Sequence, residues 1–314
     1  MLERQTWQVD STTRLDHWLL EMWPWLDRSS VRDLIRGGDI EVDGQRALKP
    51  GQYLESGTKV ALVPPTAPER TALDSEESTL GLDTPLSVLY EDDGLIVIDK
   101  PAGLTIRSRR GSAGASLTAL LSAQYPGMAH VGSVGQAGIV SLLDEGVSGP
   151  VLAAKDEATF RELKRLVARR RLEVTYTALL EGHLSGEGLI DAPLGHSKRV
   201  RERLEVAREG RTAQTAYRVQ RHLRDHDQSY TLALLLPESN RMHQLRVHMA
   251  YYGCPIVGDR QYGSRRQTLL QDRIFLHLSL LRVPHPVTGD MLSVESRLPL
   301  ELSAILQYLL RPRR

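Results

Sequence analysis

The sequence predicts an α+β fold in two unequal domains, the larger one built around a mixed or antiparallel central sheet. A chain of 314 residues is too long for one ordinary hydrophobic core and suits two cores of different size. In the larger part, the predicted strands do not alternate strictly with the predicted helices, which disfavours a doubly wound parallel sheet. We expect strands at 95–98, 151–154, 173–180, 215–220 and 230–236, and helices at 116–124, 157–169, 241–252 and 300–310.

Residues 1–63 are predicted to form the smaller α+β domain. Apolar residues recur with helical spacing in two stripes, the first at Leu15, Trp18, Leu19 and Met22 and the second at Val31, Leu34 and Ile35. Short β segments are expected at 39–42 and 59–63, and two consecutive prolines then end the domain.

Residues 64–85 are predicted to be an acidic linker, and residues 86–314 the larger domain. The stretch 64–99 holds nine acidic side chains against one arginine, so the rest of the chain is net positive although the whole carries only +1. Basic clusters stand at 107–110, 169–171, 198–211 and 311–314. Taken singly, each is more often solvated surface, but together they favour a polyanion such as RNA as partner.

Composition argues against several other classes of protein. No apolar run approaches the roughly 18 residues of a membrane helix, and the first residues lack the apolar core of a signal peptide. The single cysteine, Cys254, excludes an internal disulfide and a cysteine-rich zinc site. We therefore expect a cytoplasmic protein with no membrane partner, and a monomer, since nothing in the sequence requires a dimer.

The segment 241–252 combines an apolar stripe with two polar residues that could carry function. The stripe contains Met242, Leu245, Met249 and Tyr252, and His243 and Arg246 share a neighbouring face. His243 and His248 are five residues apart, which is wrong for two metal ligands on one helix face. The two histidines are predicted to be RNA contacts or internal hydrogen bonders. A metal-dependent hydrolase is disfavoured, and we expect no metal and no cofactor.

Six segments of the larger domain carry a resemblance. They are Tyr-Glu-Asp-Asp-Gly-Leu-Ile-Val-Ile-Asp-Lys-Pro-Ala-Gly at 90–103, Leu-Asp-Glu-Gly-Val-Ser-Gly at 143–149, Thr-Tyr-Thr-Ala-Leu at 175–179, Arg-Met-His-Gln-Leu-Arg-Val-His-Met at 241–249, Gly-Asp-Arg-Gln-Tyr-Gly at 258–263 and His-Pro-Val-Thr-Gly at 285–289. In this order they resemble the large-subunit-type (RluA/RluD-like) pseudouridine synthases, over about residues 86–300. The resemblance implies that family's type of catalytic domain.

The resemblance also implies roles for three residues in turning uridine into pseudouridine in ribosomal or transfer RNA. Asp144 would be the nucleophile at the sugar, or would assist proton removal from it. Tyr176 would stack on the uracil and could shuttle the proton lost from carbon. Arg246 would pair with Asp144 and keep it ionised. The target base must leave the RNA stack to reach a buried carboxylate, so base flipping is expected.

Other positions of the same motifs are expected to bind substrate. They are Leu142, Arg241, His243, Gln244 and His248. Without the motifs, each site residue has a plainer interpretation: Asp144 as a turn residue, Tyr176 as core and Arg246 as a surface cation.

The N-terminal domain is similar to the S-four-type RNA-binding domain. The similar segments are Arg-Leu-Asp at 14–16, Arg-Ser-Ser-Val at 28–31 and Gly-Asp-Ile-Glu-Val-Asp-Gly at 38–44. The implied role is to grip structured RNA by its shape, through basic side chains. The alternative is a generic small α+β cap.

The loop before Asp144 departs from the family pattern. The family has His-Arg where this chain has Ser141-Leu142, threonine at Val147 and lysine at Val174. The family's arginine is implied to fill the gap left by the flipped base. Leu142 could instead act as an apolar wedge, or Arg109 or Arg110 could supply the missing cation. These departures keep a second function open, a non-catalytic RNA-binding or ribosome-assembly paralogue.

Overall fold

The computed structural model describes residues 5–22, 31–32, 35, 40–47, 49–62, 81–82, 84–108, 115–197, 200, 203–263, 269–270 and 273–310. The chain divides into two compact units, the smaller formed mainly by Met1–Glu77 and the larger by most of the chain from Ser78 on. Almost all of the predicted linker 64–85 lies outside the described residues. So do Leu34, Arg109, Arg110, the cluster at 311–314 and part of the cluster at 198–211.

The smaller unit packs one described helix against short antiparallel strands. Its four-stranded sheet has the order β1 (Gln5–Gln8), β6 (Lys59–Leu62), β3 (Ile40–Val42) and β4 (Gln45–Arg46), and β2 (Thr13–Arg14) pairs with β5 (Tyr53–Leu54). Helix α1 (Leu15–Met22) buries Leu15, Trp18 and Leu19, as the stripe predicted, while Met22 at its end is exposed. Asp43 and Gly44 both have positive φ, as the tight turn between β3 and β4 requires.

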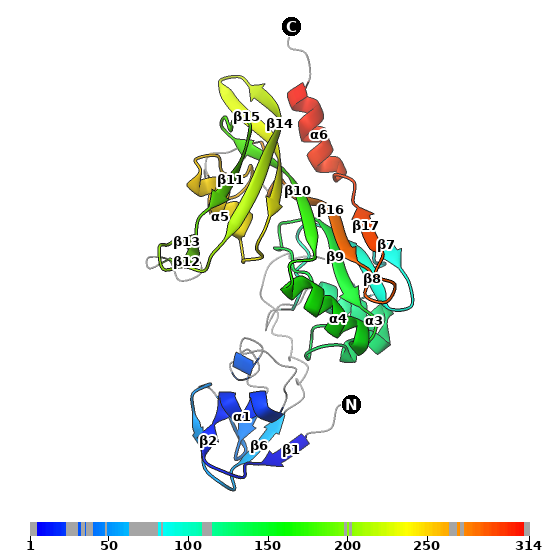
Figure 1. The fold of residues 1–314 in the computed structure, drawn as a ribbon, viewed down its shortest axis with the longest axis vertical. Helices are drawn as coiled ribbons and strands as arrows, with labels where there is room; N and C mark the ends of the chain where they lie inside the picture. The colour runs from blue at the N-terminus through cyan, green and yellow to red at the C-terminus, as the bar shows by residue number, and fades with distance from the viewer. Residues whose placement is uncertain are drawn as a thin grey trace. The chain divides into compact units, whose positions relative to one another are not determined.

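The larger unit is built on an antiparallel six-stranded sheet, shown in Figure 1. Its order is β11 (Glu187–Asp191), β14 (Gln214–Asp225), β15 (Gln228–Pro237), β10 (Glu173–Glu181), β16 (Leu276–Pro284) and β17 (Met291–Glu295). Every neighbouring pair is antiparallel. The predicted α+β class with an antiparallel sheet is therefore confirmed.

A second, three-stranded antiparallel sheet consists of β7 (Val88–Glu91), β8 (Leu95–Lys100) and β9 (Gly149–Ala154). Residues of β8 and β9 share the largest core cluster with β10, β15 and β16. Ser148, just before β9, forms a bridge with His277 of β16. This contact joins the two sheets directly after the loop that contains Asp144.

Helices cover the sheets of the larger unit, and β12 (Leu194–His196) and β13 (Leu204–Val206) form a separate two-stranded ribbon. The helices are α3 (Leu117–Gln124), the 3₁₀ helix η1 (Pro126–His130), α4 (Glu157–Ala168), α5 (Gln244–Tyr251) and α6 (Leu300–Leu310). Ser116 and Asp156 accept N–H groups of the first turns of α3 and α4. None of the described helices combines the length and apolar composition that crossing a membrane requires.

The predicted helix at 241–252 is shorter in the structure. α5 begins at Gln244, because His243 has a left-handed backbone, with φ at 53°, that cannot continue a helix. Met242 and Tyr252, two members of the apolar stripe, are not core residues, since 55% and 46% of their surfaces are exposed. Leu245 and Met249 do lie in the core.

Replacing Gly149 with alanine is expected to destabilise the larger unit strongly. Gly149 has φ at +125°, and an added Cβ would lie 2.3 Å from the carbonyl oxygen of Leu278. Strain and clash together should lower the free energy of unfolding by about 2 to 5 kcal/mol in urea denaturation. Gly289→Ala is the matched control, since φ is +80° there but no atom lies within 4 Å of the added Cβ. A loss as large in the control would contradict the steric explanation.

Candidate active site

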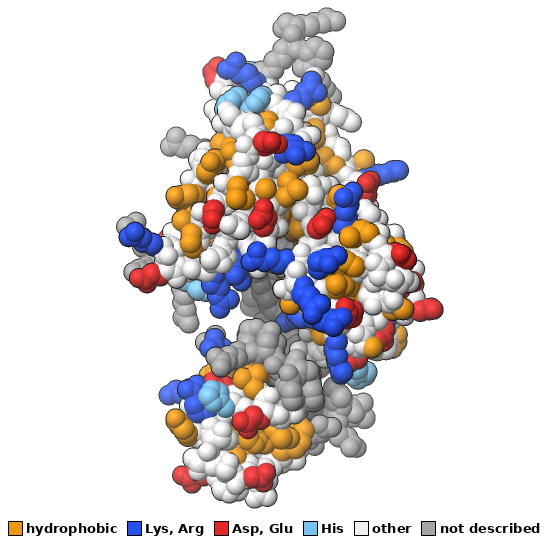
Figure 2. Space-filling model, viewed as in Figure 1, with side chains coloured by type: hydrophobic (Ala, Val, Ile, Leu, Met, Phe, Trp, Pro, Cys, Tyr) orange, Lys and Arg blue, Asp and Glu red, His pale blue; other side chains and the backbone are white. Residues whose placement is uncertain are grey.

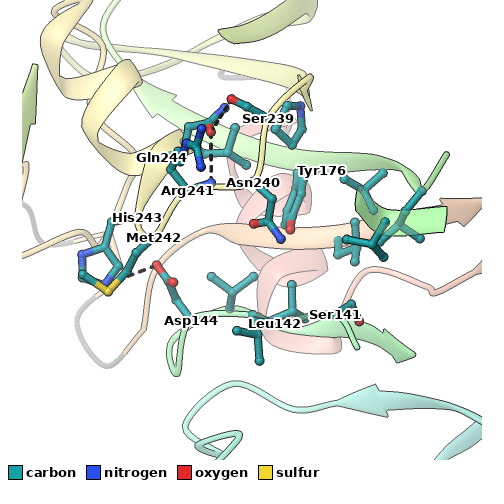
Figure 3. Close-up of a pocket in the computed structure, with 18 of the residues that line it drawn as sticks. Ser141, Leu142, Asp144, Tyr176, Ser239, Asn240, Arg241, Met242, His243 and Gln244 are labelled. Atoms are coloured by element: carbon teal, nitrogen blue, oxygen red, sulfur yellow. Dashed lines mark hydrogen bonds and ion pairs between the residues drawn. The ribbon is translucent and has the colours of Figure 1, made fainter. Parts of the chain in front are cut away.

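A cavity of about 670 Å³ opens in the larger unit, and most of the predicted site residues line it. Its walls come from the loop that contains Asp144, from Tyr176 on β10, from the segment 237–246 and from the C-terminal end of α4. Figure 3 shows Asp144 and Leu142 on one wall, with Tyr176, Asn240 and Arg241 facing them. The fold therefore brings Asp144, Tyr176 and Arg246 to one place, although they are far apart in sequence.

Backbone contacts at both ends hold the loop that contains Asp144. At its start, the hydroxyl of Ser141 accepts the N–H of Leu152 at 2.8 Å. At its end, the carbonyl of Ser148 accepts the N–H of Leu278 at 2.8 Å. The N–H of Val147 bonds to the carbonyl of Asp144 at 3.0 Å and closes a turn. The chain thus places Asp144 without the side chains that the family has at 141, 142 and 147.

Lys100 is fully buried and contacts the same loop through its side chain. Its ammonium group donates to the carbonyls of Pro101 and Leu104 at 2.9 Å and of Glu145 at 3.2 Å. Burial, together with the positive charge of Arg273, lowers the pKa of Lys100 to about 7. A positioning role for this lysine was not predicted, because its acceptors are backbone atoms that no sequence pattern reveals.

Arg246 joins two carboxylates. Its guanidinium donates through Nε and NH2 to both oxygens of Asp259, at 2.7 and 3.0 Å, and through NH1 to Asp144 at 3.1 Å. NH2 also donates to Gln261 at 3.1 Å. Burial by itself lowers the pKa of Arg246, but the hydrogen bonds and charge of Asp259, with Asp144, outweigh burial and raise it. The guanidinium is therefore a fixed positive charge beside Asp144.

Asp259 explains the Gly-Asp-x-x-Tyr-Gly motif. Its carboxylate is fully buried, and besides Arg246 it accepts the N–H groups of Gln261 and Tyr262 at 3.0 and 3.1 Å. A carboxylate with this many donors cannot turn away from Arg246 without leaving them unpaired. Asp259 therefore braces this turn and fixes Arg246.

His243 also lies close to Asp144, near the same carboxylate oxygen that Arg246 contacts. Its Nε2 is 3.8 Å from an Asp144 oxygen, and its Nδ1 bonds with the hydroxyl of Tyr262 at 2.9 Å. Burial lowers the pKa of His243 despite the nearby charge of Asp144, so the neutral ring is favoured at pH 7. The left-handed backbone at this position aims the ring at Asp144 instead of continuing the helix.

Tyr176 lies beside a β-bulge in the central strand β10. The register of pairing with β16 shifts between Thr175 and Tyr176, so that Ser279 of β16 lies opposite no residue of β10. The hydroxyl of Ser279 instead donates to the carbonyl of Thr175 at 3.0 Å. Burial, and then the negative charge of Asp144, raise the pKa of Tyr176, which keeps its phenol protonated at neutral pH.

The predicted substrate-binding residues divide into two groups. Leu142, Arg241, His243 and Gln244 line the cavity, and Leu142 is 55% exposed. Gln244 is nearly buried, and its amide bonds to Ser239 at 2.8 Å and to the Gln214 carbonyl at 2.8 Å, so it braces the wall. His248 does not line the cavity. It is fully buried between Thr215 and the carbonyl of Ala192, which favours the predicted alternative of an internal hydrogen bonder over an RNA contact.

Within the described part of the chain, no group of three or more histidine, cysteine or acidic side chains is arranged to hold a metal ion. Besides Asp144 and Glu238, the cavity lining is apolar, neutral polar or basic. The lining also includes Arg107 and Arg170, which belong to basic clusters of the sequence but were not predicted to reach the site.

Comparison with known proteins assigns this arrangement to a class of RNA-modifying isomerase. A family model described as RNA pseudouridylate synthase matches residues 94–251. The ribosomal large subunit pseudouridine synthase D of Vibrio parahaemolyticus is 32% identical over 94% of this chain and 90% of its own length. That of Pseudomonas aeruginosa is 33% identical over 96% and 93%. The chain belongs to the RluA/RluD-like family of RNA pseudouridine synthases.

A solved structure supports the same assignment. The human RNA pseudouridylate synthase domain containing 1 matches with a TM-score of 0.60 and 25% identity, over 73% of this chain and 90% of that one. An uncharacterised RNA pseudouridine synthase of Bacillus subtilis, YlyB, is 31% identical over 96% of both chains. The similarity to relatives thus extends beyond the segment that the family model matches.

Replacing Lys100 with methionine is expected to change how stability depends on pH. An unfolded lysine keeps its ordinary pKa, whereas folded Lys100 releases its proton above about pH 7. The unfolded state therefore binds more protons above that pH, and wild-type stability should rise relative to Lys100→Met by up to about 1.4 kcal/mol per pH unit. Urea denaturation of both proteins from about pH 6 to about pH 9 measures this difference. A difference that does not change with pH would show that Lys100 stays protonated.

Asp259→Asn is expected to reduce both stability and catalysis. Removing one partner of a buried ion pair should lower the free energy of unfolding by about 3 kcal/mol, and an unrestrained Arg246 should lower kcat. Urea denaturation and steady-state pseudouridine formation measure the two effects. Asp92→Asn is the control, since Asp92 accepts several hydrogen bonds but does not line the cavity. It should lower stability and leave kcat unchanged, and an unchanged kcat in Asp259→Asn would contradict a positioning role.

Proposed function

We propose that this pseudouridine synthase modifies uridine in ribosomal RNA, with Asp144 as its nucleophile. The observation that supports this role best is the contact of the Asp144 carboxylate with Arg246, at 3.1 Å, on the wall of a cavity. Relatives similar over nearly the whole chain are named ribosomal large subunit pseudouridine synthases, which supports large-subunit RNA as substrate. The relatives' names do not identify the uridine that this chain would modify.

The reaction exchanges one bond to the sugar for another. The bond between N1 of uracil and C1′ of ribose breaks, the base rotates, and C5 bonds to C1′ while the C5 proton is lost and N1 gains one. The carboxylate of Asp144 would attack the sugar, or assist proton removal from it. Arg246 would hold the Asp144 carboxylate in position as a fixed positive charge, since its raised pKa keeps the guanidinium protonated.

Tyr176 would hold the flipped base by stacking. The neutral phenol favoured by its raised pKa supports stacking and hydrogen bonding over removal of the C5 proton. His243, whose lowered pKa favours a neutral ring, lies 3.8 Å from an Asp144 oxygen and would contact the base or sugar. Arg241 would add a contact from the same wall of the cavity.

An apolar rim would deliver the base to the cavity. Leu142 and Met242 are each 55% exposed and both line the cavity, and Figure 3 places them near Asp144. Apolar side chains can insert between bases and unstack them, so Leu142 would replace the family's arginine as a wedge. Met242 has the exposure and flexibility to assist it.

The smaller unit would grip structured RNA, as an S-four-type domain does. Its helix and antiparallel strands fit the predicted α+β pattern of residues 1–63. We propose further that the enzyme works as a monomer and in the cytoplasm, where ribosomal RNA is available. The alternative of a non-catalytic paralogue gains no support from the site, because Asp144 keeps its partner Arg246 despite the altered loop.

Asp144→Asn is expected to abolish pseudouridine formation without unfolding the chain. The neutral amide cannot act as a nucleophile, and Asp144 lies on a cavity wall and not in the core. Release of tritium from an unmodified large-subunit RNA transcript labelled at uracil C5 measures the reaction. Asp290→Asn is the control, because this exposed aspartate lies in the turn after β16 and should leave activity unchanged. An active Asp144→Asn, or an inactive wild type on every RNA, would overturn the proposal.

A further inference from the structure

Helix α4 ends in a backbone conformation that favours glycine, but the chain has an arginine there. Arg170 has φ at +56°. Its N–H bonds to the carbonyl of Val167 at 3.0 Å, and the N–H of Arg171 bonds to the carbonyl of Leu166 at 2.9 Å. This left-handed ending of a helix is usually made by glycine, because a Cβ crowds the neighbouring carbonyl. Arginine at this position therefore costs backbone strain that glycine would avoid, and a function of the Arg170 side chain would account for it.

The side chain of Arg170 is exposed and lines the catalytic cavity, beside Val167, Ala168 and Leu172. Arg107, in the loop that follows β8, is also exposed and lines the cavity. Neither forms an ion pair with any residue within the described ranges. Figure 2 shows that Lys and Arg side chains gather around α4 on the larger unit.

The charges of the cavity wall leave these two guanidiniums available to a ligand. Among the lining residues, four arginines face two carboxylates, Asp144 and Glu238. Arg246 is already bonded to Asp144 and Asp259, and Arg241 donates to the carbonyl of Thr212 at 3.2 Å. Within the described residues, Arg107 and Arg170 are therefore the lining arginines whose guanidinium groups have no ion-pair or hydrogen-bond partner.

We propose that Arg170, together with Arg107, binds a phosphodiester of the RNA strand next to the flipped uridine. The inference rests on the proposed function at this cavity. When the base enters the cavity, its backbone must stay at the rim, and exposed guanidiniums there match phosphate oxygens with paired hydrogen bonds. The uracil is neutral and gives no reason for two further cations. Arg170 would then supply, from the end of α4, a cation that the loop lost at Leu142.

If Arg170 has a structural role instead, its replacement should have the opposite effect on the stability of the fold. A cation near the C-terminus of a helix is stabilised by the helix dipole, and Arg165 and Arg169 are present there as well. If the dipole explains Arg170, its replacement should weaken the fold. If RNA explains it, replacement by glycine should relieve backbone strain and weaken only RNA binding.

Arg170→Gly in the full chain separates these roles. We expect a melting temperature that is unchanged or raised by up to a few degrees. We expect KM for an unmodified large-subunit RNA transcript to rise about tenfold, with a much smaller change in kcat. In filter binding to the same transcript, the slope of log affinity against log salt should become shallower by about 0.7 to 0.9, the loss of one phosphate contact. Arg170→Lys keeps the charge but not the paired geometry and should be intermediate.

Two variants serve as matched controls. His226→Gly also replaces a left-handed residue, with φ at 50°, in the exposed turn between β14 and β15 away from the cavity lining. It should change stability in the same way and leave KM and the salt slope unchanged. Arg171→Ala removes an exposed arginine from the same run that does not line the cavity. It should change the salt slope less than Arg170→Gly.

The outcomes distinguish this inference from the proposed function. If wild type releases tritium and Arg170→Gly has the same KM and salt slope, the phosphate contact is wrong and the function stands. A large fall in melting temperature for Arg170→Gly, or equal salt slopes for Arg170→Gly and Arg171→Ala, also overturns it. If wild type releases no tritium, the function fails, while filter binding still decides whether Arg170 contacts RNA.

Discussion

The single guanidinium of Arg246 binds two carboxylates, those of Asp259 and Asp144. Asp259 takes the paired hydrogen bonds at 2.7 and 3.0 Å, and only NH1 remains for Asp144 at 3.1 Å. Asp259 is fully buried and tied to two backbone N–H groups, so it fixes the guanidinium. The side chain of Asp144 is 23% exposed, so a substrate can reach it while Arg246 balances its charge.

The loop that contains Asp144 tolerates unusual side chains because backbone atoms hold it. Lys100 donates to the carbonyl of Glu145, and Ser148 accepts from the backbone of β16. The family's histidine position holds Ser141, whose hydroxyl accepts the backbone N–H of Leu152 and ties the start of the loop to β9. Leu142 can then change without moving Asp144, so the position of the Asp144 carboxylate does not depend on the side chain at 142.

Part of the fold could be predicted from local pattern. The apolar run of β8 and the amphipathic helix α4 matched the prediction to within two residues, because burial of a strand or of a helix face imposes its own periodicity. The helix at 241–252 was predicted to begin three residues too early and to end one residue too late, and the early start arises because nothing local reveals that His243 leaves the helical region of the backbone. The exposed position of Met242 follows from the same turn.

The sequence by itself determined the family and the strand that bears Tyr176, because short motifs and local periodicity specify them. Only the tertiary structure decided which groups meet. Arg246 and Asp144 are 102 residues apart, and Lys100 and Glu145 are 45 apart. It also decided that His248 is buried while Arg170 reaches the cavity. Partners across such distances depend on how the two sheets pack, and periodicity along the chain carries no information about that packing.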